Sequence, residues 1–251
     1  MMKARTALYI STIVCCLSLC VHVFYVQANS NKKSINYCTY YDDSVGQQPV
    51  YSHELLDSQL SRLEQVEYYN LPQDYITLSQ SESQRQNLQF RRFFKVDGLR
   101  VYDFLVGHFR VADFMSKDTL FTINESQLPV GTTQYWLCDT AVLHRFLDLV
   151  LWMRSKGYND SALFVKNGHR HPAYNAFKGG VPQSYHMQGS AIDIQVGDIN
   201  RNGIVNAADK KIILDILEQK IIGNTGGLGL YPKSDVVHFD TRGYRARWNS
   251  H

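Results

Sequence analysis

The stretch Ser184-Tyr185-His186-Met187-Gln188-Gly189-Ser190-Ala191-Ile192-Asp193 decides how this chain is interpreted, together with Asp235-Val236-Val237-His238-Phe239-Asp240 further along. The two segments contain His186, Asp193 and His238. Two imidazoles and one carboxylate fill three of the four positions of a tetrahedral zinc site, and a fourth position left to water distinguishes a catalytic zinc from a structural one. The chain has five cysteines but no cysteine clusters of a structural zinc module. The set therefore predicts a catalytic zinc centre.

Both segments alternate as strands do. Residues 190–196 place apolar side chains on one face and Asp193 on the other, and residues 236–240 place His238 and Asp240 on a shared face. A carboxylate in so apolar a strand is costly unless it is paired or metal-bound. If the two strands are neighbours, Asp193 and His238 meet above one sheet face, and Asp240 is expected to orient an imidazole. The alternative is that these are ordinary polar residues of strands.

The combination SxHxxGxAxD and DxxHxD resembles the D-Ala-D-Ala metallopeptidases of the LAS group. These zinc peptidases also include lysostaphin and the amino-terminal domain of hedgehog proteins. The resemblance covers about residues 107–248, and it includes three further segments: NGHRHPAYN at 167–175, GGLGLYP at 226–232 and RGYRARW at 242–248. His169 and His171 stand where relatives more usually have Tyr and Ser. The resemblance therefore does not define the fine shape of the substrate pocket.

The resemblance implies an α+β fold, with a small antiparallel sheet flanked by helices and zinc on one sheet face. It implies that the two histidines and the aspartate named above bind the zinc. Asp235 occupies the place of the family's general base, although as a strand-entry residue it could also be a solvated turn acid. Arg170 is expected to stabilise an oxyanion or to hold a substrate carboxylate. Ser184 is expected to support the loop that carries the first histidine.

The implied function is zinc-dependent hydrolysis of peptidoglycan stem peptides or cross-links in cell-wall remodelling. The enzyme would be a D,D-carboxypeptidase or an endopeptidase, and loop lengths do not choose between the two. The competing hypothesis is a non-catalytic zinc-containing module of hedgehog type that binds the cell wall or a protein. The presence of Arg170 and Asp235 beside a complete ligand set favours the enzyme.

A second metal-binding pattern lies between the zinc ligands. Residues 198–209 have the length of an EF-hand loop, with a glycine, Gly203, at its sixth position. Residues 207–219 follow as the predicted exiting helix, as in dockerin repeats. The alternative is an Asn-rich surface loop closed by turn hydrogen bonds. The predicted calcium ligands are Asp198, Asn200, Asn202, Ile204, Asn206 and Asp209.

The amino terminus is predicted to be an export signal. Lys3 and Arg5 precede an uncharged apolar run over residues 7–26, and a small-residue cleavage pattern ends at Ala28. We therefore expect residues 1–28 to be removed on export to the periplasm or cell envelope. The alternative is that the run is retained as a membrane anchor.

Charge and cysteine usage agree with export. The formal net charge is only +3, so nothing suggests a nucleic-acid partner. Three of the cysteines lie in the amino-terminal apolar run, which leaves Cys38 and Cys138. An even pair in an exported chain predicts one disulfide, and the alternative is two buried thiols.

The rest of the chain divides into two regions. Residues 29–106 match no motif, and their role is unassigned; residues 107–251 form the predicted peptidase domain. Leucine spacing in the first region favours a helix over 52–69, and an Asp-Gly pair favours the turn of a hairpin over 96–106. In the second region the patterns predict a helix over 140–156 and strands at 162–166, 190–196 and 236–240.

Overall fold

The computed structural model of the protein describes residues 48–118 and 133–249, which fall within one unit of the chain. The predicted signal at 1–28, its alternative as an anchor at 7–26, and Cys38 lie outside the described residues. No helix within the described ranges is long and apolar enough to cross a membrane.

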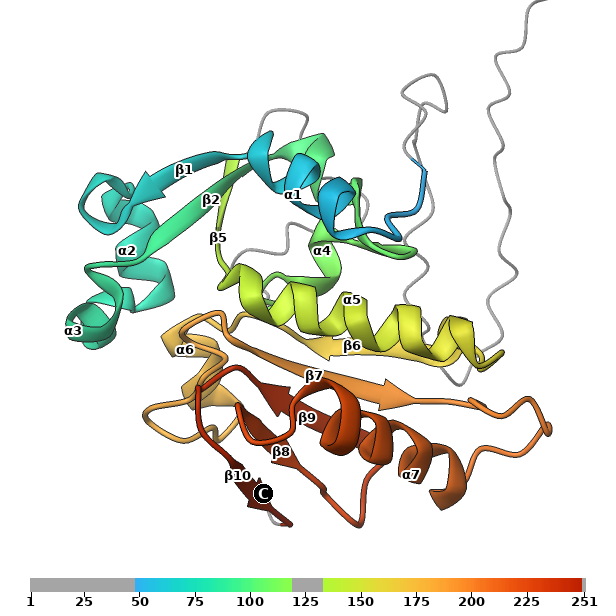
Figure 1. Ribbon diagram of the computed structural model, residues 1–251. Coiled ribbons are helices and arrows are strands. Elements are labelled where there is room, and N and C mark those ends of the chain that lie inside the picture. The colour runs from blue at the N-terminus through green and yellow to red at the C-terminus, as the bar shows by residue number, and fades with distance from the viewer. Residues whose placement is uncertain (1–47, 119–132, 250–251) are drawn as a thin grey trace, which may run out of the picture. The chain divides into compact units, whose positions relative to one another are not determined.

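A five-stranded sheet forms the carboxyl-terminal half of the fold (Figure 1). Its neighbours are antiparallel except for the last pair, β8 and β10, which is parallel. The predicted α+β fold with a small antiparallel sheet is therefore confirmed, with one parallel edge. In spatial order the strands are β10 (Ala246–Trp248), β8 (Gly227–Gly229), β9 (Val236–Asp240), β7 (Ala191–Val196) and β6 (Leu163–Asn167).

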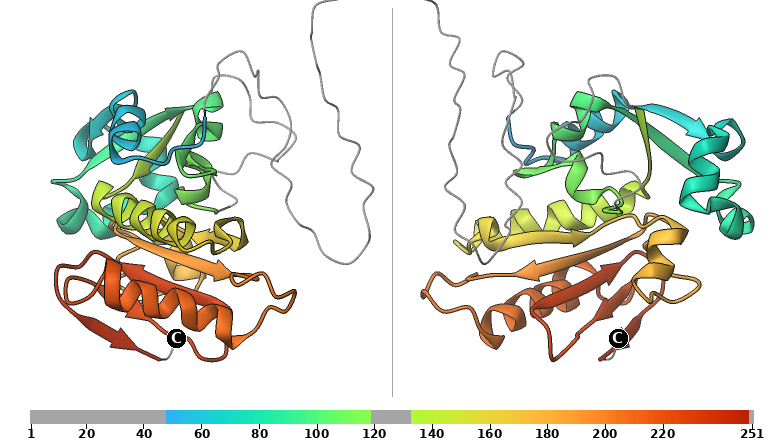
Figure 2. Two further views of the ribbon diagram at one scale, coloured as in Figure 1. Left: turned by 45° about the vertical axis from the view of Figure 1, so that its right-hand side comes forward. Right: turned by 180° about the vertical axis from the view of Figure 1, so that it is seen from behind.

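The two faces of this sheet differ in polarity, as the strand alternation predicts. One face contributes Ile192, Ile194, Val237 and Phe239 to the hydrophobic core. Helices α5 (Thr140–Ser155) and α7 (Ala207–Ile216) also contribute to that core, and α7 lies in front of the sheet in Figure 1 and behind it in the reverse view of Figure 2. A π-helical turn, Leu217–Ile221, extends α7. The opposite face is left for polar side chains.

A three-stranded antiparallel sheet and short helices precede the main sheet. The strands are β1 (Glu64–Glu67), β2 (Arg92–Asp97) and β5 (Thr133–Leu137). The helices are α1 (His53–Ser61), α2 (Gln73–Ser79), α3 (Arg85–Leu88) and α4 (Val111–Phe114), and α6 (Pro172–Phe177) follows β6. Short 3₁₀ turns occupy Tyr68–Asn70, Ser81–Gln84, Gly98–Tyr102 and Asp160–Ala162.

Two predictions for this region are wrong. The helix expected over 52–69 ends at Ser61, because the residues from Glu64 pair with β2 instead. The hairpin expected over 96–106 does not form, since β2 already has strands on both sides and its chain continues into a 3₁₀ turn. Residues 104–106 (β3) pair instead with Phe109–Arg110 (β4).

The amino-terminal region shares the core of the main sheet. Val50, Leu56 and Phe94 belong to the same buried cluster as residues of α5 and of the main sheet. Helix α1 contacts α5 directly, through hydrogen bonds that join His53 to His144 and to Asp148. Residues 48–106 therefore help to fix the position of α5, which supports the sheet from its apolar side.

Candidate metal centre

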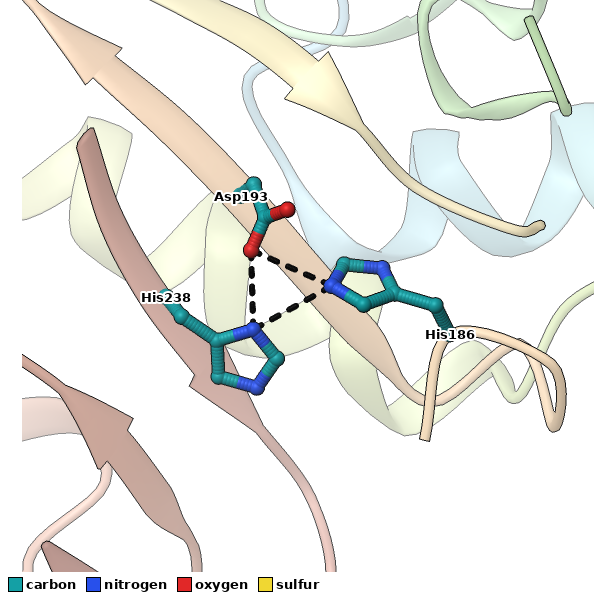
Figure 3. Close-up of side chains that lie close together, drawn as sticks. All are labelled: His186, Asp193 and His238. Carbon is teal, nitrogen blue, oxygen red and sulfur yellow. Dashed lines mark hydrogen bonds and ion pairs between the residues drawn. The ribbon is translucent and has the colours of Figure 1, made fainter. Parts of the chain in front are cut away.

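Asp193 and His238 lie directly opposite each other on the neighbouring strands β7 and β9. The same register continues across the sheet, with Asn167 of β6 opposite Asp193 and Gly229 of β8 opposite His238. Because paired residues of neighbouring strands share a face, this row places a carboxylate and an imidazole together on the polar side of the sheet. His186 reaches them from the loop that precedes β7 (Figure 3).

Three ligand atoms converge at this point. The Nε2 atom of His186 lies 3.1 Å from Oδ1 of Asp193 and 3.2 Å from Nδ1 of His238. The Nδ1 atom of His238 lies 2.8 Å from Oδ1 of Asp193. Ligands about 2.0–2.1 Å from a tetrahedral ion would be about 3.3 Å apart. All three residues are buried, and they form the one group of three or more His, Cys, Asp and Glu side chains in the described ranges that could hold a metal ion.

Hydrogen bonds at the outer nitrogens select the tautomers. His186 Nδ1 is 2.6 Å from the carbonyl oxygen of Gly168, and His238 Nε2 is 3.1 Å from Oδ2 of Asp240. Both nitrogens face acceptors and therefore carry hydrogen, so the inward His186 Nε2 and His238 Nδ1 present lone pairs to each other and to a carboxylate oxygen. Three lone pairs this close require a shared proton or a cation, and second-sphere acceptors of this kind are typical of metal-binding histidines.

Electrostatic interactions among the three ligands keep the Asp193 carboxylate ionised. Burial alone would raise the pKa of Asp193, but the charges and hydrogen bonds of His186 and His238 hold it well below its usual range. Burial lowers the pKa of His186. For His238 the effect of burial is outweighed by hydrogen bonds to Asp193 and Asp240, so its pKa is raised. An anionic carboxylate between two imidazoles is a suitable donor set for zinc.

The loop of His186 is shaped by a close approach to the chain at Leu137. Gly189 has a φ of 69°, and a Cβ there would lie 2.4 Å from the Leu137 carbonyl oxygen, so only glycine fits. Ser184 is buried and its Oγ accepts from the backbone N–H of His186 at 3.3 Å, as expected of a residue that supports this loop.

Arg170 binds the other oxygen of the ligand carboxylate. Its NH2 group donates to Oδ2 of Asp193 at 2.5 Å, and the amide of Asn167 donates to the same oxygen at 3.0 Å. The remaining oxygen, Oδ1, faces the imidazoles. The Arg170 loop is itself held by Phe114 and Ser116, which bond to the backbone N–H groups on either side of it. Asn167 is the first residue of the NGHRHPAYN segment, but no pattern in the sequence distinguishes it as a site residue.

His169 and His171, the two departures from the usual motif, are both buried beside this loop. His171 Nδ1 forms an ion-pair contact of 2.6 Å with Oδ2 of Asp118. The pKa of His169 is well below its usual range because of burial, so this imidazole is neutral. Neither ring belongs to the group that could hold a metal. The His171 ring thus ties the Arg170 loop to Asp118.

Asp235 is exposed and lies outside the metal-ligand group. Its Oδ2 accepts a hydrogen bond of 2.7 Å from the side-chain amide of Gln195. Gln195 is two residues beyond Asp193 and so shares its sheet face. The bond therefore draws the Asp235 carboxylate toward the polar side of the sheet. Strand alternation places Gln195 on this face, but only the pairing of β7 with β9 brings it to Asp235.

Asp240 is fully buried and forms several hydrogen bonds on the outer side of the His238 ring. Besides facing the imidazole, it accepts from the backbone N–H of Gly227 at 3.0 Å and from two nitrogens of Arg242, at 2.8 and 2.6 Å. Burial alone would raise the pKa of Asp240, but the hydrogen bonds and charges of Arg242 and His238 hold it far below its usual range. The sequence predicted a residue that orients an imidazole, and Asp240 has that position in the structure; Arg242 was not foreseen.

The predicted calcium loop is closed by its own side chains. Asp198 accepts from the N–H groups of Asn202 and Gly203, and Asp209 is fully buried and accepts from the N–H of Ile199 and Asn200. Gly203 has a φ of 83°, which explains a glycine at that position. These contacts are those of the alternative interpretation, a loop closed by turn hydrogen bonds, and they leave calcium binding as a prediction.

A comparison with known protein families supports a metallopeptidase site. Residues 121–240 match the model of the Peptidase M15 family. Over these residues the chain is similar to the M15 metallopeptidases. The match contains all three converging ligands, His186, Asp193 and His238, and the described part of the M15-like segment includes most of the main sheet. Neither the curated proteins nor the solved structures yielded a match. The disulfide between Cys38 and Cys138 stays a prediction, because the first of the two lies outside the described residues.

Proposed function

We propose that the M15-like domain binds zinc and hydrolyses peptides of peptidoglycan, as a D,D-carboxypeptidase or an endopeptidase. One observation carries the proposal: the lone pairs of His186 Nε2 and His238 Nδ1 converge with a carboxylate oxygen of Asp193 at separations that suit one tetrahedral ion. Zinc bound there would lower the pKa of a water molecule toward ~7 and polarise the scissile carbonyl.

Asp235 is the proposed general base. Its exposed carboxylate stands three residues before His238, and the Gln195 amide holds one of its oxygens, which leaves the other to accept a proton from the attacking water. The protonated carboxyl group would then return that proton to the leaving amine.

Arg170 is the proposed partner of substrate. One arm of its guanidinium is held by Asp193, and this contact places the group beside the ligand carboxylate. Its remaining N–H donors can bind a substrate carboxylate or the developing oxyanion, since a guanidinium carries five donors in a rigid fork. Asp193 thus links the position of the substrate-binding group to the position of the metal.

Digestion of defined muropeptides tests the proposal. The zinc-loaded protein is expected to release D-Ala if it is a carboxypeptidase, or to split a cross-link if it is an endopeptidase, and mass spectrometry separates these products. His238→Ala should lose both stoichiometric zinc and hydrolysis, whereas Tyr69→Phe, on an exposed turn, should keep both. If wild type binds zinc but yields no product from any muropeptide, the proposed hydrolysis is wrong and the non-catalytic binding module is favoured.

Export and calcium binding complete the proposal. The signal pattern at 1–28 supports delivery to the periplasm or cell envelope, where peptidoglycan is found, with anchoring through residues 7–26 as the alternative. Calcium binding at 198–209 is supported by the oxygen spacing and the glycine at the turn. With only two carboxylates, the loop should have an affinity of about 10⁻⁴–10⁻³ M, the range of extracellular modules.

A further inference from the structure

Tyr231 lies just beyond the strand next to His238. Gly229 of β8 stands opposite His238, and Trp248 of β10 stands opposite Gly229. A Cβ at Gly229 would lie 2.9 Å from the Cζ atom of Tyr231 and 2.9 Å from the indole nitrogen of Trp248. The two aromatic rings therefore occupy the space above Gly229, on the sheet face that carries the imidazole of His238.

The phenol is aligned by its neighbour. The indole Nε1–H of Trp248 donates to the phenol oxygen of Tyr231 at 3.3 Å, and the indole ring centre is 5.2 Å from that of His238. Because the oxygen accepts from the indole, the phenol's own hydrogen is a donor to a different acceptor. The hydroxyl group thus lies on the sheet face that carries His238, against the indole that contacts the His238 ring, and its hydrogen is not directed at Trp248.

The backbone holds Tyr231 in an unusual conformation. Its φ is 37°, in the left-handed region that costs a non-glycine residue about 1–3 kcal/mol and persists only where surrounding contacts impose it. Its carbonyl oxygen accepts from the Lys210 ammonium at 2.6 Å and from the N–H of Ser234 at 3.0 Å. Strain of this kind is concentrated at functional sites.

The electrostatic surroundings place the phenol among the site's charges. Burial raises the pKa of Tyr231, the carboxylates of Asp193 and Asp240 raise it further, and the indole bond and Arg170 oppose them. The hydroxyl group therefore keeps its hydrogen at neutral pH and remains a donor.

We propose that Tyr231 is a further catalytic residue, which donates its phenolic hydrogen bond to the carbonyl oxygen of the scissile amide as that oxygen gains negative charge. The inference rests on the proposed hydrolysis. Arg170 approaches from the loop after β6, whereas Tyr231 approaches from β8, on the other side of Asp193 and His238. The two donors thus flank the ligand row. No bond to Tyr231 forms or breaks, and it retains its hydrogen throughout.

Tyr231→Phe tests the proposal because it removes one oxygen atom and keeps the ring. In the zinc-loaded protein we expect kcat on muropeptides to fall about 10²–10³-fold, the effect of losing one oxyanion donor, with KM and zinc content unchanged. The affinity for a phosphinate analogue of alanyl-alanine, a tetrahedral anion, should fall by a similar factor. The matched control is Tyr69→Phe, which removes a phenol that bonds Gln89 on the exposed surface.

Trp248→Phe separates catalysis from support. If the phenol only anchors the indole, Trp248→Phe should reproduce the whole loss seen in Tyr231→Phe, and that result would overturn the proposal. Unchanged phosphinate affinity in Tyr231→Phe would overturn it as well. Phosphinate binding does not require turnover, so weaker binding by Tyr231→Phe supports the contact even if wild type cleaves no muropeptide. Absence of cleavage by wild type would count against the proposed hydrolysis alone.

Discussion

The imidazole of His238 and the carboxylate of Asp240 are joined at 3.1 Å on the side of the ring away from the other two ligands. Asp240 is fully buried and is bound by both donors of the Arg242 fork. The carboxylate therefore selects the tautomer that presents Nδ1 inward, and it does so from a fixed position. Such second-sphere contacts raise the basicity of a ligand and orient its ring.

Asp240→Asn should weaken zinc binding about 10–100-fold, the usual effect of losing a second-sphere partner. The amide keeps the shape of the side chain but removes its charge and can present a hydrogen to His238. Competition with a chromophoric chelator measures the affinity. Asp215→Asn, which removes a carboxylate paired with Lys211 on the exposed face of α7, is the control and should leave affinity unchanged. Equal affinities in the two variants would show that Asp240 has no orienting role.

Acidification should release zinc through His238. Its pKa in the metal-free protein is raised because hydrogen bonds to Asp193 and Asp240 outweigh burial. Protons therefore compete for Nδ1 from a higher pH than they would at an isolated imidazole, whose pKa is 6.5, and a ligand must be deprotonated to bind. We expect zinc affinity to fall steeply from about pH 7 to about pH 5, as measured by chelator competition at fixed ionic strength. A flat profile over this interval would contradict the assignment.

Asp235→Ala should retain zinc and lose about 10²–10⁴-fold in kcat, the range contributed by general acid–base catalysis. Gln195→Ala should also retain zinc. Its kcat should fall less than that of Asp235→Ala, because the substitution frees the Asp235 carboxylate without removing it. The size of the loss in kcat distinguishes the two roles, because Gln195→Ala leaves the Asp235 carboxylate in place whereas Asp235→Ala removes it. Near-normal turnover in Asp235→Ala would transfer the base role to another residue.

Gly189→Ala should destabilise the fold and distort the His186 loop. The new Cβ would meet the carbonyl oxygen of Leu137 at 2.4 Å, in a backbone conformation with φ of 69°. We expect a loss of about 2 kcal/mol or more in the free energy of unfolding. Gly157→Ala is the matched control, since Gly157 has a φ of 75° and nothing within 4 Å of a Cβ; it should lose about 1 kcal/mol. Urea denaturation compares them, and similar losses would rule out the close contact as the cause.

Millimolar calcium should raise the Tm of the zinc-loaded protein through preferential binding to the folded state. At a hundred times the dissociation constant the gain is about 2.7 kcal/mol. Asp198→Ala should remove the calcium response. Asp209 is less suitable to replace, because it is buried and bonds the backbone at Ile199, Asn200 and Asn206 whether or not calcium is present. A wild-type Tm that ignores calcium would mean that 198–209 is an Asn-rich turn.

Local sequence patterns were sufficient to predict the two central strands of the main sheet that carry Asp193 and His238. Alternation in residues 190–196 and 236–240 placed Asp193 and His238 on the polar face of their strands, and the register confirms that they are opposite each other. This worked because one face of each strand is buried, so a shift by one residue would expose a whole apolar set. The amino-terminal region lacked such a constraint. There β2 could pair with more than one partner, and local turn chemistry at Asp97 suggested the wrong one.

The sequence by itself determined the ligand types, their strands and the α+β class, because these depend on residue chemistry and on a period of two along the chain. Only the tertiary structure decided which other side chains reach the site. Gln195 meets Asp235 across two strands, and Trp248 and Tyr231 meet above Gly229 from separate segments. Such contacts depend on strand order and on the absence of a Cβ at one position, and no local pattern encodes either of these.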